Sequence, residues 1–73
     1  MKSIEQIQRE IPYGDVMTRE KFIEIVEYGG FIPYDGDGYF HDGEQELENQ
    51  NVWMYTIKQM KTCPYPYVIW YNK

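Results

Sequence analysis

Apolar and polar side chains alternate along this chain with two different periods. From Thr18 to Gly29 the apolar residues recur every three or four positions, as on one side of a helix. Thr18 is a favoured N-cap residue, and Gly29-Gly30 is a typical stop. The pattern therefore predicts a helix over residues 19–28. Its apolar face consists of Phe22, Ile23, Ile25 and Val26.

A shorter helical pattern lies near the N-terminus. Ser3 and Gln6 have the spacing of a capping box, in which each side chain bonds the backbone of the other residue. We predict a helix from Ile4 to about Glu10, ended by Pro12 and Gly14. A helix this short is marginal in isolation and needs a packing partner.

The clearest strand pattern covers residues 67–71, which are β-branched or aromatic throughout. Tyr67, Ile69 and Tyr71 point to one face, and Val68 and Trp70 to the other. A strand that is apolar on both sides either has both faces covered or presents an aromatic patch to a partner. The 19–28 helix can cover one face, and the N-terminal helix can cover part of the other.

The middle of the chain has short aromatic runs at residues 31–34 and 39–41. They flank Asp35-Gly36-Asp37-Gly38, and Asp-Gly between such runs favours a β-hairpin with its turn at residues 35–38. Pro33 cannot donate to a strand ladder, which places the first of these strands at a sheet edge.

The next segment is less regular. Residues 43–50 are polar and acidic, and we predict a connection there. Residues 51–55 have a short strand pattern, followed by a helical turn that Thr56 caps and that runs through Met60. A single helix over residues 53–60 fits almost as well, so both interpretations stay open.

Together these elements predict an α+β fold, with a small, mostly antiparallel sheet of three to four strands packed by one main helix and a short N-terminal helix. The chain has 73 residues, which suits a single domain over residues 1–73. Cys63 is the only cysteine, so no internal disulfide can form, and we expect it to be buried. We find neither a signal peptide nor a membrane-length apolar run, and we expect a cytoplasmic protein.

Charge is distributed very unevenly. The formal net charge is −5, and no lysine or arginine occurs between Lys21 and Lys58. The carboxylates in that interval are Glu24, Glu27, Asp35, Asp37, Asp42, Glu44, Glu46 and Glu48. Direct binding of nucleic acid or of an anionic membrane needs a basic patch, so this pattern argues against both.

Known catalytic and metal motifs do not fit the acidic middle. A calcium loop beginning at Asp35 would place Tyr39 and Phe40 where an oxygen ligand and a glycine belong. His41 and Cys63 are single, so a zinc ligand set is missing. The glycines lack P-loop spacing, and a domain this small offers carboxylates little cleft for acid–base catalysis. We therefore expect no metal, no cofactor and no enzyme activity.

The carboxylates favour a binding role instead. Asp42, Glu44, Glu46 and Glu48 alternate, so in an extended strand they would point the same way at a spacing of about 6.5–7 Å. This spacing resembles that of phosphates along DNA. Such a row is either a solubilising surface or a surface for a basic groove on another protein. Aromatic residues would anchor it. The candidate partner-binding residues are Tyr34, Asp35, Asp37, Tyr39, Asp42, Glu44, Glu46, Glu48 and Trp53.

Two segments, residues 17–40 and 67–73, resemble a widespread group of small proteins encoded in tailed-phage genomes. The shared pattern is a Thr-capped helix, a glycine-ended turn, an aromatic Asp-Gly hairpin and a closing V-x-W-Y-N-K. The matching positions are Thr18, Phe22, Gly30, Phe31, Asp35, Gly36, Gly38, Tyr39, Trp70, Tyr71, Asn72 and Lys73. The resemblance covers a little under half of the chain. It implies a phage origin and a related fold, and residues 42–62 depart from the pattern.

Small acidic phage proteins without catalytic sites often bind and disable one host protein. The leading hypothesis is therefore a protein that modulates or inhibits a host protein with a basic surface, in the host cytoplasm, for example by occupying a nucleic-acid groove. The alternative is an assembly or virion accessory protein that self-associates through the face of Tyr67, Ile69 and Tyr71. The chain would be a monomer or a weak homo-oligomer.

Overall fold

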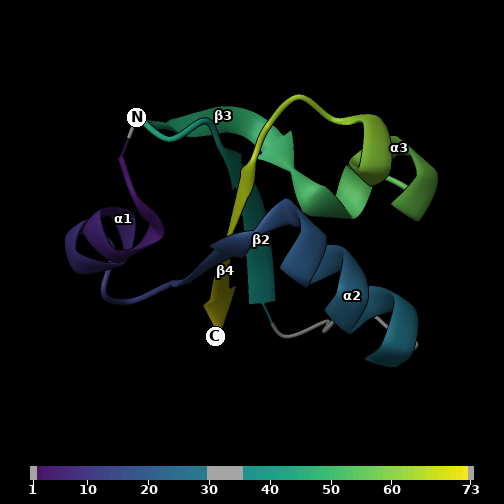
Figure 1. The fold of residues 1–73 in the computed structure, drawn as a ribbon, viewed down its shortest axis with the longest axis horizontal. Coiled ribbons are helices and arrows are strands. Elements are labelled where there is room, and N and C mark those ends of the chain that lie inside the picture. Colours follow the sequence, from purple (N-terminus) through teal and green to yellow (C-terminus); the bar gives the residue numbers. More distant parts are fainter. Residues whose placement is uncertain (1, 30–35, 73) are drawn as a thin grey trace.

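A computed structural model describes residues 2–29 and 36–72 of the chain. It is an α+β fold, as the sequence predicts, with a four-stranded antiparallel sheet in the order β1-β4-β2-β3 (Figure 1). The strands are β1 (Asp15–Thr18), β2 (Gly36–His41), β3 (Glu46–Asn51) and β4 (Tyr67–Asn72). The helices are α1 (Ile4–Glu10), α2 (Arg19–Gly29) and α3 (Ile57–Thr62), with a 3-10 turn η1 (Val52–Met54).

Strand β4 lies inside the sheet and pairs on both of its edges. Ile69 is opposite Val16 of β1 on one side and opposite Tyr39 of β2 on the other. The predicted strand at residues 67–71 is therefore confirmed. Because β4 is apolar on both faces, the structure has to cover both.

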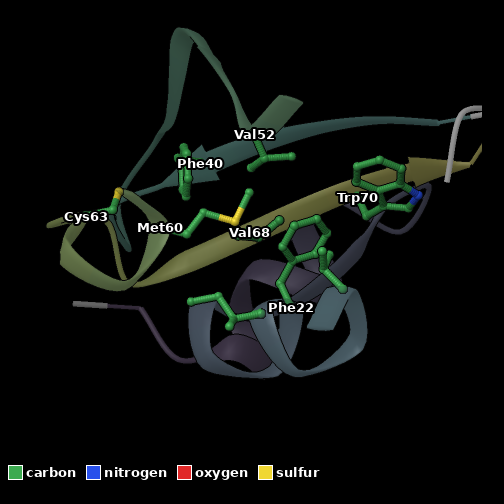
Figure 2. Packing of buried hydrophobic residues seen from close by; sticks show 9 residues of the cluster. Phe22, Phe40, Val52, Met60, Cys63, Val68 and Trp70 are labelled. Carbon is green, nitrogen blue, oxygen red and sulfur yellow. The ribbon is translucent and has the colours of Figure 1, made fainter. Parts of the chain in front are cut away.

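The larger hydrophobic cluster covers the face of Val68 and Trp70 (Figure 2). Helix α2 supplies its apolar stripe, and α3 with the residue after it adds further side chains to the same side. The buried members are Phe22, Ile23, Val26, Phe40, Val52, Met60, Cys63, Val68 and Trp70. Cys63 is buried and free, as expected for a cysteine that packs as a small apolar side chain.

The opposite face of β4 is covered by α1. Ile7, Val16 and Ile69 form a second buried cluster, and Ile7 and Ile69 are fully buried. In Figure 1, α1 lies on one side of the sheet, and α2 and α3 lie on the other. Both faces are thus covered by the helices that the sequence suggested for this purpose.

Side-chain caps set the start of each helix. Ser3 Oγ accepts a hydrogen bond from the Gln6 amide while Gln6 Oε1 accepts one from the Ser3 amide, which confirms the predicted capping box. Thr18 Oγ1 caps α2 by accepting from the Lys21 amide at 3.1 Å. Thr56 caps α3 in a second capping box, so α3 begins after Thr56 as one of the two interpretations held.

Helix α1 also protects one edge of the sheet. The side-chain amide of Gln8 donates to the Gly14 carbonyl, and its oxygen accepts from the Val16 amide at 2.9 Å. The side chain thereby takes the place that a neighbouring strand would have beside β1. An edge with its polar groups occupied in this way is less able to pair with another chain.

The sequence interpretation is wrong in the middle of the chain. Gly36 to Gly38 were placed in a hairpin turn but belong to β2, where Gly38 is opposite Trp70. Residues 46–51 are strand β3 rather than a polar connection. The strand β1 was not predicted at all. The predicted strand at residues 31–34 lies outside the described residues.

The segment that follows β3 also differs from one prediction. Residues 52–54 form the 3-10 turn η1, so neither a strand over residues 51–55 nor a single helix over residues 53–60 is present. Asn51 Oδ1 accepts from the Trp53 amide at 2.8 Å and thereby caps η1.

Gly38 provides a test of the packing between β2 and β4. A Cβ atom at this position would lie 2.4 Å from both Val52 Cγ2 and Trp70 Cε3, which is far closer than van der Waals contact. Gly38→Ala should lower the free energy of unfolding by about 1–3 kcal/mol, as overpacking of a core does. Urea unfolding followed by tryptophan fluorescence measures the change.

Gly29→Ala is the matched control, because a Cβ there meets nothing within 4 Å. It should leave stability unchanged or raise it by up to about 1 kcal/mol, since alanine favours the helix. Equal stability of Gly38→Ala and the wild type would show that β2 does not approach Trp70 this closely.

Candidate functional site

The turn between β2 and β3 displays part of the predicted acidic surface. Asp42 Oδ1 accepts hydrogen bonds from the Glu44 amide at 2.8 Å and from the Gln45 amide at 2.9 Å. These two bonds lower the pKa of the Asp42 carboxyl group. Gly43 has a φ of 102°, a conformation that glycine adopts without strain. The turn therefore has a defined shape, and Asp42 has a structural role in it.

The buried side chain of His41 also stabilises this turn through a hydrogen bond. His41 is only 3% exposed, and its Nδ1 accepts a hydrogen bond from the Gly43 amide at 2.9 Å. Burial lowers the pKa of His41, and the opposing effect of the Asp42 and Glu46 carboxylates is smaller. Neutral His41 is thus the form that fits the folded turn, because a protonated Nδ1 cannot accept this bond.

The segment before α1 also stabilises the turn, through a backbone hydrogen bond. The Lys2 amide donates to the Gly43 carbonyl at 3.1 Å. The Lys2 ammonium group pairs with Glu10 at 2.9 Å, and this hydrogen bond raises the pKa of Lys2. The turn is therefore connected to both ends of α1.

Three tyrosines gather on the face of the sheet that α1 partly covers. Tyr13 stacks on Tyr71 with ring centroids 5.5 Å apart, and Tyr39 meets Tyr71 edge-on at 5.7 Å. Tyr13 comes from the segment between α1 and β1, and its side chain is 71% exposed. We call Tyr13, Tyr39 and Tyr71 the tyrosine cluster.

A carboxylate from β3 joins this cluster. The Tyr71 hydroxyl donates to Glu46 Oε2 at 2.7 Å, a short distance typical of a bond to a charged acceptor. Burial, followed by this bond, raises the pKa of Tyr71, so the phenol stays neutral. Asp37 is directly opposite Tyr71 in the sheet and shares its face. Aromatic rings and carboxylates therefore lie side by side.

The predicted site residues fall into separate groups. Asp37, Tyr39 and Glu46 lie on the face of the tyrosine cluster, whereas Asp42 and Glu44 lie in the turn. Trp53 is on the opposite side, where it packs against the larger cluster with its ring 5.4 Å from that of Trp70. Tyr34 and Asp35 lie outside the described residues, as does the side chain of Glu48.

The expected straight row of alternating carboxylates does not form. Residues 42–45 make the turn, so only Glu46 and Glu48 of the four belong to a strand. The register of the β2–β3 pairing also shifts between Tyr39, which is opposite Asn51, and His41, which is opposite Glu46. A regular phosphate-like spacing is therefore absent along this segment.

Tyr13 and Tyr71 were not among the predicted site residues. Alternation along β4 already places Tyr71 on the face of Ile69. Tyr13 follows Pro12 in a loop, and no periodic pattern indicates its position. Only the tertiary structure brings the two rings together.

Among the described residues, no three histidine, cysteine, aspartate or glutamate side chains gather closely enough to hold a metal ion. No helix in residues 2–29 or 36–72 has the length and hydropathy needed to cross a membrane. Comparisons with protein-family models, with curated proteins and with solved structures give no match for this chain.

His41 generates a prediction about pH. Its pKa is lowered from 6.5 in the folded chain, so the unfolded chain takes up a proton more readily. As the pH falls through about 6.5, the free energy of unfolding should therefore decrease, until the folded pKa is also passed. Urea unfolding at pH 7.5, 6.5, 5.5 and 5.0, all of them above the carboxylate range, measures this loss.

His41→Asn is the informative variant, because the asparagine oxygen can accept the Gly43 amide bond but does not titrate. We expect it to be less stable than wild type at pH 7.5 and nearly independent of pH between about 5 and 7.5. The same pH slope in both proteins would exclude His41 as its origin.

Proposed function

We propose that this chain is a phage-encoded protein that binds a basic surface of a host protein and thereby modulates or inhibits it. The proposal rests on the charge distribution, on the ordered acidic turn and on the resemblance to small tailed-phage proteins. Its place of action would be the host cytoplasm, where such a target is found.

The β2–β3 turn is the observation that carries this proposal. Its backbone is held by Asp42, by buried His41 and by the Lys2 amide, while the side chain of Glu44 is exposed. Glu46, the first residue of β3 after the turn, is also exposed. A binding surface that is already ordered loses less conformational entropy when a partner docks.

A compact turn suits a local basic patch better than a long groove. The carboxylates of residues 42–48 do not form a straight row, so mimicry of evenly spaced phosphates receives no support from their arrangement. Attraction between opposite charges would instead orient the encounter and raise the association rate. Salt should weaken the binding accordingly.

The alternative hypothesis of self-association used the face of Tyr67, Ile69 and Tyr71. Ile69 is fully buried beneath α1 in the second cluster, and Tyr67 and Tyr71 pack against that cluster. The residue at the centre of the supposed interface is therefore inside the monomer.

Affinity capture from bacterial lysate tests the proposed function. Immobilised wild-type protein should retain a basic host protein at about 50 mM salt and release it at about 500 mM salt. The double variant Glu44→Gln/Glu46→Gln should retain clearly less of the same protein, because it lacks two negative charges at the turn.

The double variant Glu5→Gln/Glu24→Gln is the matched control, since it removes the same charge from exposed positions on α1 and α2. It should capture as much as the wild type. An absence of any partner at low salt, or equal losses in the two double variants, would contradict the proposal.

A further inference from the structure

The tyrosine cluster has exposed aromatic surface on the face of the sheet that α1 partly covers. Tyr13 is stacked through one side of its ring on Tyr71, yet 71% of its surface is exposed. Tyr13 follows Pro12, and Ile11 just before it packs against the second cluster. An exposed ring held in place by its neighbour is a ready-made stacking surface with little freedom to lose.

Carboxylate groups lie beside these rings. The Tyr71 hydroxyl donates a hydrogen bond to Glu46 Oε2 at 2.7 Å, and the two oxygens of this carboxylate can accept further hydrogen bonds. Asp37 shares the face of Tyr71, and the acidic turn begins at Asp42. The faces of tyrosine rings and the carboxylates both attract a positive charge.

We propose that the tyrosine cluster together with Glu46 binds an arginine side chain on the surface of the partner protein. This inference rests on the proposed function and specifies its contact. The guanidinium plane stacks on the face of Tyr13 that is turned away from Tyr71, and the nearby carboxylate of Glu46 attracts its positive charge. An anion is disfavoured by the carboxylates, and a purely apolar group would displace water from the Glu46 carboxylate without offering it a partner.

Arginine fits this arrangement better than lysine. Its guanidinium group is planar, lies flat on an aromatic ring and donates several hydrogen bonds in one plane. A lysine ammonium is a compact, strongly hydrated charge that gains less from a flat ring. The two side chains carry the same charge, so a preference between them separates stacking from simple attraction.

The experiment uses two probe peptides of equal charge, acetyl-(Gly-Arg)₄-amide and acetyl-(Gly-Lys)₄-amide. Titration of ¹⁵N-labelled full-length protein should shift the amide signals of Tyr13, Tyr39, Glu46 and Tyr71 with the arginine peptide. The lysine peptide should bind more weakly. Tyr13→Ala should reduce affinity for the arginine peptide by about two- to fivefold, as expected for an exposed cation–π contact.

Tyr28→Ala is the control, because Tyr28 is 84% exposed on α2 and belongs to no part of the cluster. It should bind the arginine peptide as the wild type does. Thermal unfolding of Tyr13→Ala tests whether the fold is retained, and Glu46→Gln provides a second variant that keeps an acceptor for Tyr71. This variant should also bind the arginine peptide more weakly.

Equal affinity for the two peptides, or an unchanged affinity in Tyr13→Ala and Glu46→Gln, would overturn the inference. The outcome can be told apart from a failure of the proposed function. If a host protein is captured equally by wild type and Tyr13→Ala, the arginine site is wrong and the binding role stands. If no host protein is captured although the arginine peptide binds at the cluster, the site stands and the proposed function is wrong.

Discussion

The fold depends on one constraint, which is that β4 is apolar on both faces and must be shielded from water on both. Val68 and Trp70 require cover on one side, and Ile69 requires it on the other. Removal of apolar surface from water is the main favourable contribution to folding, so the helices are placed by this strand. Helices α2 and α3 shield one face, and α1, which is too short to be stable alone, is held against the second.

The candidate site follows from the limited size of α1. A helix from Ile4 to Glu10 covers Ile69, but Tyr71, two residues further along β4, has Tyr13 stacked on it and reaches Glu46 with its hydroxyl. At the other end of β2, buried His41 supports the acidic turn. The tyrosine cluster and the acidic turn both lie at strand ends, because the middle parts of the strands are buried in the core.

Local rules predict the elements whose causes are local. The caps at Ser3, Thr18 and Thr56 are readable because each acts within three residues, and the Tyr67–Asn72 strand is readable from its composition. Gly38 lies in a strand for a non-local reason, since the side chains of Trp70 and Val52 leave no room for a Cβ atom. The Asp-Gly signal was applied to residues 35–38, whereas the same dipeptide at Asp42-Gly43 forms the β2–β3 turn. Strand β3 is polar, and neither its pairing nor the contact of Tyr13 with Tyr71 is encoded by a pattern near it.

The position of β4 has a consequence for synthesis on the ribosome. The last of the four strands along the chain is inserted between the first and the second, so β1 and β2 cannot be joined until residues 67–72 have left the exit tunnel. Contacts between distant parts of the chain form slowly compared with local ones. Until then the apolar residues of β1 and β2 lack the strand against which they pack, and transiently exposed apolar surface of this kind favours aggregation.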